Sequence, residues 1–211
     1  EYILLLNNDT IIEKDAIKLL VESAERDDKI GIVSPKVLYM HNKNLIYSAG
    51  GEFIKWLCVG RGKFQRKDAN LFGNEDREIN FAEGSCLLVK RKVLEVVGFI
   101  PEKYFMYFED LDFSLKVNKK FKIYYCSKAV IYHKAGGGTS WLNASPLYNY
   151  YFTRNRILFY KELNAFWQYY SILFSLIIVL LKTFLIILKG KKKNDLIKSL
   201  WKGFGSGLTK K

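Results

Sequence analysis

Short apolar runs separated by polar turns fill much of residues 1–160, and an amphipathic segment lies between the first two runs. Tyr2–Leu6 is a continuous apolar run, which is typical of a strand covered on both faces of a sheet. The segment that follows places four apolar residues at helical spacing: Ile17, Leu20, Val21 and Ala24. A second apolar run comes at 30–33, and the order strand, helix, strand predicts an α/β sheet.

The alternation continues downstream with less regular spacing. Glycine turns dominate 37–73, where no long helix is predicted. The apolar run 79–89 predicts a strand interrupted near Gly84, and the short helix predicted at 90–97 ends at Gly98, a residue that often terminates helices. Further elements are a helix at 110–119 and strands at 123–126 and 129–132.

The last part of the chain contains a long apolar segment with one polar stripe. Segment 166–188 has 23 residues and, as a helix, would be about 34 Å long, enough to cross a bilayer core of roughly 30 Å. Polar residues within and beside it are spaced to fall on one narrow face: Asn164, Gln168, Ser171, Ser175, Lys182 and Lys189. We therefore divide the chain into an α/β part, 1–160, and a hydrophobic helix with a basic tail, 161–211.

Composition and charge narrow the class of protein. Hydrophobic residues make up 49% of the chain, which excludes a disordered protein. The three cysteines, Cys58, Cys86 and Cys126, lack paired or metal-binding spacing, so we expect reduced core residues in a cytosolic compartment. Of the net charge of +13, a surplus of eight comes from 166–211, with nine lysines and one aspartate. A basic tail beside an apolar segment predicts an anionic membrane surface as partner, and no recognisable motif favours nucleic acid.

Candidate chemistry begins with three acids that directly follow an aromatic run. Segment 105–112 passes from aromatic residues and a methionine to Glu109, Asp110 and Asp112. Such a sequence places carboxylates on the wall of a pocket, or else at an ordinary helix N-terminus, where the helix dipole favours acids. The segment alone does not separate these two interpretations.

Two other polar residues end predicted strands. Asp9 follows the first strand, at a position where open α/β sheets bind ligands, and a carboxylate beside Asn7 and Asn8 can hold Mg²⁺ or Mn²⁺. Taken by itself, Asp9 is better interpreted as an N-cap or turn residue. His133 follows the last predicted strand and can join the same metal, although a histidine beside a loop is more often only a loop residue. Together with Asp110, these residues predict a metal-assisted transfer site.

Four segments match a known family in the same order along the chain. They are LLNNDT at 5–10, GSCLLV at 84–89, YFMYFEDLD at 104–112 and YHK at 132–134. These segments resemble the inverting family 2 glycosyltransferases of the GT-A fold, particularly the rhamnosyltransferase-like bacterial branch. The resemblance extends from Tyr2 to about residue 160.

This resemblance implies a GT-A type mixed α/β sheet, with residues 1–160 as its catalytic and acceptor half and a hydrophobic helical tail behind it. It implies a nucleotide-sugar donor, a divalent metal (Mg or Mn) held by Asp9 and His133, and Asp110 as general base. The substrate-binding residues would be Asn7, Asn8, Gly84, Ser85, Glu109 and Asp112. The reaction would be inverting hexosyl or rhamnosyl transfer to a glycan or lipid-linked acceptor, in cell-surface polysaccharide synthesis at the cytoplasmic face of the membrane.

The chain departs from the family pattern in three places. Segment 99–102 is FIPE where the family has Phe-Asp-Glu, and 119–121 lacks the expected glycine, so both turns are expected to differ. The chain also opens within an apolar run and without an initiator methionine. We therefore expect the nucleotide-binding first half to be missing and this fragment to be inactive by itself.

Two other functions remain open from the sequence. A processive polysaccharide synthase would share the acids, but its Gln-x-x-Arg-Trp element and several spanning helices are not found in this sequence. A non-catalytic membrane-docking module would keep the acids as a vestige. For 166–188 we expect binding in the plane of the cytosolic leaflet, with the stripe toward water or the catalytic part and the lysines of 189–193 on headgroups. A span that packs its stripe on a partner is the close alternative.

Overall fold

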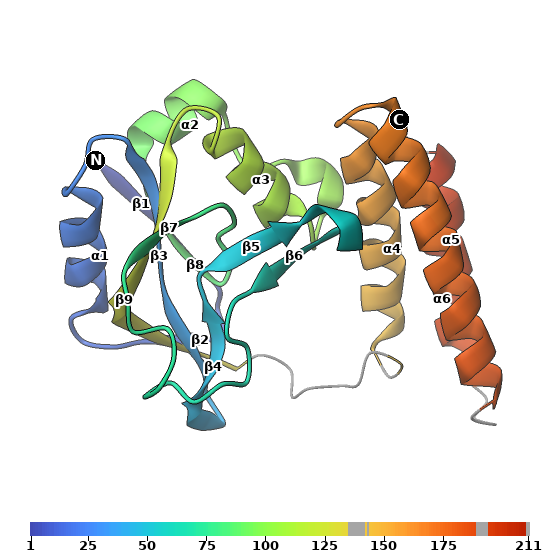
Figure 1. The fold of residues 1–211 in the computed structure, drawn as a ribbon, viewed down its shortest axis with the longest axis horizontal. Helices are drawn as coiled ribbons and strands as arrows, with labels where there is room; N and C mark the ends of the chain where they lie inside the picture. The colour runs from blue at the N-terminus through green and yellow to red at the C-terminus, as the bar shows by residue number, and fades with distance from the viewer. Residues whose placement is uncertain (135–141, 143, 189–193, 210–211) are drawn as a thin grey trace. The chain divides into compact units, whose positions relative to one another are not determined.

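The predicted strands join one seven-stranded mixed sheet in the computed structural model, which describes residues 1–134, 142, 144–188 and 194–209 (Figure 1). Its strands are β1 Tyr2–Leu6, β2 Thr10–Ile12, β3 Ile30–Tyr39, β4 Asn42–Ala49, β7 Arg77–Ile79, β8 Cys86–Lys90 and β9 Lys122–His133. The main strand order is β1-β8-β3-β9-β2, with β4 beside β3 and β7 beside β9. β3 and β9 run parallel, whereas the other pairs are antiparallel. The predicted α/β class is thus confirmed.

Helices cover both faces of this sheet because its strands send apolar side chains alternately to the two sides. In β3, Ile32 belongs to one apolar core and the next residue, Val33, to the other. α1 (Ala16–Ala24) packs on the Val33 side, and α2 (Arg91–Val97) and α3 (Glu109–Val117) contribute to the core on the Ile32 side. The two cores fix the strand register, and the register in turn fixes which loops meet at each end of the sheet.

Three details of the structure differ from the predicted elements. β1 packs on the cores of both faces, through Leu5 on one side and Tyr2 and Leu4 on the other, but it is only half-buried, since it ends the strand order and pairs only with β8 among the described strands. Ile17 does not lie on the buried face of α1 and is 45% exposed, because that face is formed by Ala16, Leu20, Ser23 and Ala24. The strands predicted at 123–126 and 129–132 are one strand, β9, which keeps its pairing with β3 through a register shift.

The irregular region 37–73 contains a small second sheet. β5 (Gly51–Ile54) and β6 (Val59–Gly62) pair antiparallel, and the 3-10 helix η1 (Lys55–Leu57) joins them. Gly51 and Gly60 pack so closely on the Phe81 ring that an added Cβ would clash with it. All three cysteines are free and buried, as expected for reduced core residues.

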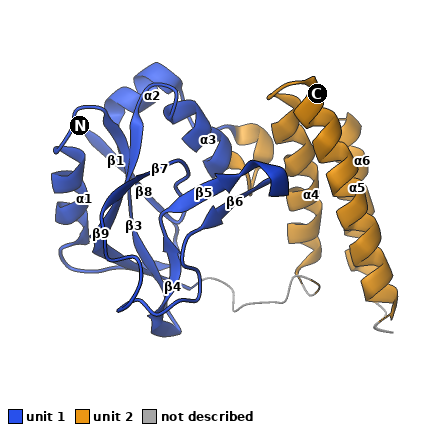
Figure 2. Cartoon of the chain, in the orientation of Figure 1, with its two compact units in different colours: residues 1–101, 110–137 blue, residues 102–109, 138–211 orange. Residues whose placement is uncertain are grey.

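Contacts divide the chain into two compact units (Figure 2). Unit 1 is Glu1–Pro101 with Asp110–Gly137 and contains the sheet; unit 2 is Glu102–Glu109 with Gly138–Lys211. Unit 2 contains the 3-10 helix η2 Glu102–Tyr104 and the helices α4 Pro146–Lys161, α5 Ala165–Leu188 and α6 Asn194–Thr209. The helix predicted at 166–188 is confirmed by α5, whereas α4 and α6 were not predicted. By its contacts α4 groups with α5 and α6, although the sequence-based division at residue 160 assigned it to the α/β part.

The polar stripe of α5 is buried inside unit 2. Ser171, Ser175 and Lys182 are each at most 3% exposed, and the Lys182 Nζ donates a hydrogen bond to the Asn149 Oδ1 of α4 at 2.8 Å. Of the two expected orientations of the stripe, the one toward water is therefore wrong; the stripe instead faces α4, which lies in the part predicted to be catalytic and supplies the polar partner. The opposite side of α5 exposes large apolar side chains: Phe166, Tyr169, Leu173, Ile177, Leu180, Leu181, Phe184, Ile187 and Leu188. The lysines of 189–193, which are predicted to contact lipid headgroups, lie outside the residues that the structure describes.

Candidate active site

The turn after β1 and the segment before β8 meet because these two strands are antiparallel neighbours. Leu6 pairs with Cys86, and the Asn7 backbone N–H donates to the Ser85 carbonyl oxygen at 3.1 Å. The predicted element Asn7-Asn8-Asp9 therefore lies beside Gly84 and Ser85. Asn7 and Asn8 are exposed, whereas Ser85 is buried and its hydroxyl has no hydrogen-bond partner among the described residues.

Asp9 and His133 come together at the same end of the sheet. β2 follows the Asp9 turn and pairs with the last residues of β9, with Thr10 opposite His133. The His133 Nε2 lies 3.1 Å from the Asp9 Oδ1, and the Lys134 backbone N–H donates to the Asp9 carbonyl oxygen at 2.9 Å. The His133 Nδ1 is buried and has no hydrogen-bond partner within the described part of the chain.

The Asp9–His133 pair fits a divalent metal only as part of a ligand set. Neighbouring ligands of an octahedral ion with bonds of about 2.1 Å lie about 3.0 Å apart, which matches the separation of these two side chains. Among the described residues there is no group of three or more His, Cys, Asp or Glu side chains placed to hold a metal. A cation held by this pair would therefore take its other ligands from amide or backbone oxygens of the chain, from water or from substrate oxygens.

Asp110 is the second residue of α3 and contacts the Gly84 segment. The Gly84 backbone N–H donates to the Asp110 Oδ2 at 3.1 Å, and the Leu111 N–H donates to its Oδ1 at 2.8 Å. Burial raises the pKa of the Asp110 carboxyl above its usual value, although these hydrogen bonds lower it in part. A carboxylate of raised pKa is a stronger base than an ordinary aspartate, and two backbone donors fix its direction.

Glu83 is a functional candidate that the sequence analysis missed. Burial, together with the nearby Asp110 carboxylate, raises the pKa of Glu83 to about 8, while hydrogen bonds from Tyr47 and Ser48 oppose this shift. The Tyr47 ring also packs edge-on against the His133 ring, with centroids 4.9 Å apart. Tyr47 therefore connects the Glu83–Asp110 pair with the Asp9–His133 pair. The available signal was an acid within an apolar run, at Phe81-Ala82-Glu83, where an unpaired acid is rare.

The two other acids of the predicted site lie on either side of Asp110 in α3. Glu109 is the first residue of this helix and belongs by its contacts to unit 2. Asp112 is 5% exposed, and its Oδ2 accepts a hydrogen bond from the Lys116 Nζ at 3.2 Å, one helical turn later. Asp112 is thus held by a cation on its own helix, and its predicted role toward substrate stays a prediction.

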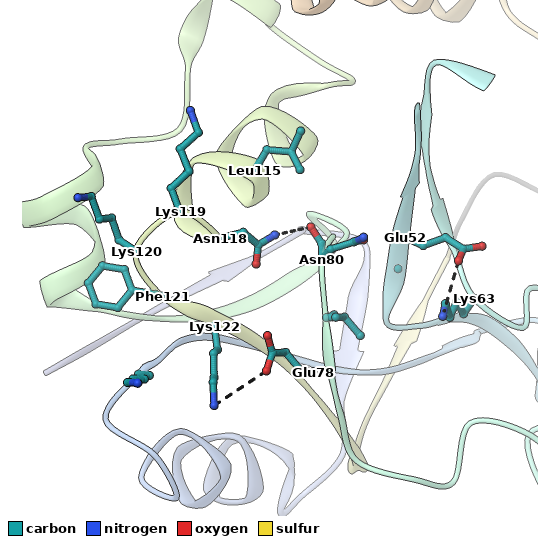
Figure 3. A pocket seen from close by; sticks show the side chains of 13 residues that line it. Glu52, Lys63, Glu78, Asn80, Leu115, Asn118, Lys119, Lys120, Phe121 and Lys122 are labelled. Carbon is teal, nitrogen blue, oxygen red and sulfur yellow. Dashed lines mark hydrogen bonds and ion pairs between the residues drawn. The ribbon is translucent and has the colours of Figure 1, made fainter. Parts of the chain in front are cut away.

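A cavity of about 730 Å³ lies elsewhere in unit 1, and none of the predicted site residues lines it (Figure 3). Five lysines line it: Lys29, Lys63, Lys119, Lys120 and Lys122. Lys122 pairs with Asp27 at 2.9 Å and approaches Glu78 at 4.0 Å, while Lys63 approaches Glu52 at 3.6 Å. Lys122, which lines this cavity, is the first residue of β9, and His133 is the last. The cavity and the Asp9–His133 pair therefore lie at opposite ends of that strand.

The geometry of these loops is typical of a class of enzymes. A mixed α/β sheet brings a carboxylate–imidazole pair and a buried carboxylate held by backbone donors to loops at its strand ends, an arrangement suited to group transfer. The chain belongs to glycosyltransferase-like family 2, whose model matches residues 1–145. This match confirms the family predicted from the four sequence segments.

Two kinds of curated relative share parts of this chain. A low-salt glycan biosynthesis hexosyltransferase, Agl10, of Haloferax volcanii is 26% identical over 121 residues, which are 57% of this chain and 38% of the relative. An N-acetylglucosaminyl-diphospho-decaprenol L-rhamnosyltransferase of Mycobacterium tuberculosis is 40% identical over 62 residues, 28% of this chain and 20% of the relative. The matches thus cover well under half the length of these relatives.

Proposed function

We propose that this chain is the catalytic and acceptor-side part of an enzyme that transfers a hexosyl or rhamnosyl group, with inversion, from a nucleotide-sugar donor to a glycan or lipid-linked acceptor. The observation that carries this proposal is the meeting of Asp9 with His133, and of Gly84 with Asp110, in loops that the strand register sets side by side. Family membership and the named transferase relatives support the reaction class.

In this proposal Asp110 removes the proton from the acceptor hydroxyl as that oxygen attacks the sugar carbon C1. The hydrogen bonds from Gly84 and Leu111 hold the carboxylate in one orientation, and its raised pKa favours proton uptake. The bond between C1 and the nucleoside diphosphate breaks on the opposite face, so the anomeric centre inverts. A Mg²⁺ or Mn²⁺ ion held by Asp9 and His133 would neutralise charge on the leaving diphosphate.

The donor and the apolar helix suggest the location of this reaction. Nucleotide sugars are cytosolic, and α5 is the one described helix long and apolar enough to cross a membrane. The name of the mycobacterial relative includes N-acetylglucosaminyl-diphospho-decaprenol, a lipid-linked sugar. We propose that α5 associates the enzyme with the cytoplasmic face of the cell membrane and thereby holds it beside a lipid-linked acceptor.

The test of the reaction uses the complete protein and its Asp110→Asn variant. The amide keeps the shape of the carboxylate but cannot accept a proton, so transfer should fall by about 10²–10⁴-fold while donor binding stays within a factor of about two. Donor binding is measured by calorimetry and product configuration by NMR. Near-normal transfer in the variant would refute the role of Asp110, and a product with retained configuration would refute the inverting mechanism.

The position of the tail relative to the membrane has its own test. A single cysteine in place of Lys202, on α6, is offered to a membrane-impermeant maleimide in intact cells; the three native cysteines are buried and give little background. Protection until the cells are lysed is expected if α5 lies in the cytosolic leaflet. Labelling from outside would show instead that α5 spans the membrane.

A further inference from the structure

The backbone just before Asp110 adopts a conformation that its own residues do not favour. Phe105, Tyr107 and Phe108 have φ angles of 66°, 64° and 75°, in the left-handed region that non-glycine residues avoid. This segment, Glu102–Glu109, belongs to unit 2, and Asp110 is the next residue in the chain. Something in unit 2 must therefore hold this aromatic segment in place.

Two neighbouring residues of α4 supply the hydrogen bonds that hold it. The Asn155 Nδ2 donates to three carbonyl oxygens, those of Tyr104, Met106 and Tyr107, at 3.0, 2.7 and 2.9 Å. The Arg154 Nη2 donates to the carbonyl oxygens of Lys103 and Tyr104 at 3.0 and 2.8 Å. Both side chains are buried, with Asn155 at 0% and Arg154 at 4% exposure.

Arg154 also determines which way the Asn155 amide points. The Arg154 Nε donates to the Asn155 Oδ1 at 2.7 Å, so the amide oxygen is occupied and the two N–H groups must face the loop carbonyls. No other placement of the amide satisfies both sides. The pair thus behaves as one unit, with arginine orienting asparagine and both binding the same backbone.

Aromatic packing ties the three left-handed residues to the same helix. The ring of Phe105 packs on Tyr151 and the ring of Tyr107 on Tyr148, with centroids 5.1 and 5.0 Å apart. The Phe108 ring packs on Phe152 at 5.2 Å. Each unfavourable φ angle therefore coincides with a side chain held on α4, which favours a loop fixed in one conformation.

We infer that Arg154 and Asn155 are positioning residues for the general base: they fix the loop from which α3 begins and so set where that helix places Asp110, whose carboxylate the Gly84 and Leu111 N–H groups then orient. This inference rests on the proposed function of Asp110. It gives unit 2 a part in catalysis beyond membrane association, through a helix that also binds the Lys182 of α5.

The test compares variants of two buried asparagines on α4 in the complete protein. Asn155→Asp keeps the shape and the contact with Arg154 but turns a carboxylate oxygen toward three carbonyl oxygens. We expect kcat to fall at least about tenfold, the donor KM to stay within about twofold, and the pH dependence of kcat to shift, because the base is misdirected. Asn149→Asp is the matched control, since Asn149 is 1% exposed and its Oδ1 still accepts from Lys182.

Several outcomes would overturn the inference. Normal kcat in Asn155→Asp would do so, as would a loss of activity that only follows the loss of folded protein and recurs in Asn149→Asp. If Asn155→Asp does not fold, Arg154→Lys decides instead, because lysine keeps the charge but cannot contact both the amide and the two carbonyls. Should Asp110→Asn retain transfer, the proposed function fails; should Asp110→Asn be inactive and Asn155→Asp normal, only this inference fails.

Discussion

The two units both bury polar side chains, but they use them differently. At the strand ends of unit 1, Glu83, Asp110 and His133 are titratable, and burial raises the pKa values of both carboxyl groups. In unit 2, Arg154 and Asn155 donate hydrogen bonds to backbone carbonyls. Burial therefore tunes reactivity in unit 1, whereas in unit 2 it fixes a conformation.

The difference follows from the elements that carry these residues. Unit 1 places its polar groups in loops beyond apolar strands, where one side can remain open to a substrate. Unit 2 places them on α4 against the 102–109 loop, where buried donors need protein acceptors because water is excluded. Substitutions at the strand ends should thus change the chemistry and the pH dependence of stability, whereas substitutions of Arg154 and Asn155 should act through the conformation of the loop that they hold.

After the loss expected for Asp110→Asn, the largest effect is expected at the Asp9–His133 pair. Asp9→Asn and His133→Gln should each raise the Mn²⁺ concentration that gives half-maximal transfer by at least about tenfold, since each removes a proposed ligand. Direct Mn²⁺ binding, followed by electron paramagnetic resonance, should weaken in parallel, while Asp28→Asn, an exposed acid of unit 1, should change neither. Unchanged Mn²⁺ binding in both variants would refute the proposal that Asp9 and His133 bind the metal.

A smaller effect is expected where α6 packs on α4. A Cβ on Gly203 would overlap the Tyr150 carbonyl oxygen, whereas a Cβ on Gly205 would meet nothing within 4 Å. Gly203→Ala should destabilise unit 2 by about 1–3 kcal/mol, and Gly205→Ala should be neutral or stabilising by up to about 1 kcal/mol, because alanine favours helix. The measurement is the thermal unfolding midpoint of each variant in the complete protein, which should be lower for Gly203→Ala than for Gly205→Ala. Equal midpoints would mean that α6 does not pack on α4 through Gly203.

The meeting of polar residues at the strand ends of unit 1 could be predicted because its signals are local. Apolar runs gave the strands, and antiparallel pairing of β1 with β8 and of β2 with β9 then brought Asn7 to Ser85 and Asp9 to His133. Glu83 was missed because its environment depends on Tyr47 and Ser48, which lie on β4, a strand that the irregular pattern of 37–73 does not predict. Its raised pKa is a property of tertiary packing.

Unit 2 was harder to predict, for a physical reason. α4 is buried over most of its second half, including Arg154, Asn155 and Arg156, so it shows no apolar stripe that would identify a surface helix. α6 carries three glycines, at 203, 205 and 207, which lower helix propensity although two of them are needed for close packing on α4. The α5 helix was predicted because its apolar side is exposed and its length is unusual.

The smallest effect is expected in the pH dependence of stability, which should reflect the protonation of the buried Glu83 at the strand ends. The pKa of Glu83 is about 8 in the folded protein, against 4.5 for an ordinary glutamate side chain, so the folded state binds this proton more tightly than the unfolded state. The contribution of the protonated Glu83 to the free energy of unfolding is fully present below about pH 4.5 and is lost as the pH rises toward 8, where the buried carboxylate ionises beside Asp110.

The side chain of Glu83→Gln cannot ionise, so the thermal midpoint of this variant should fall less between pH 6 and pH 9 than that of the unmodified protein. Each kcal/mol of difference in stability should shift the midpoint by roughly 2–4 °C. Glu95→Gln, an exposed acid on α2, serves as control and should keep the original slope. Parallel pH slopes for Glu83→Gln and the unmodified protein would show that Glu83 is already ionised in the folded state, and the contrast between the two units would then rest on Asp110 alone.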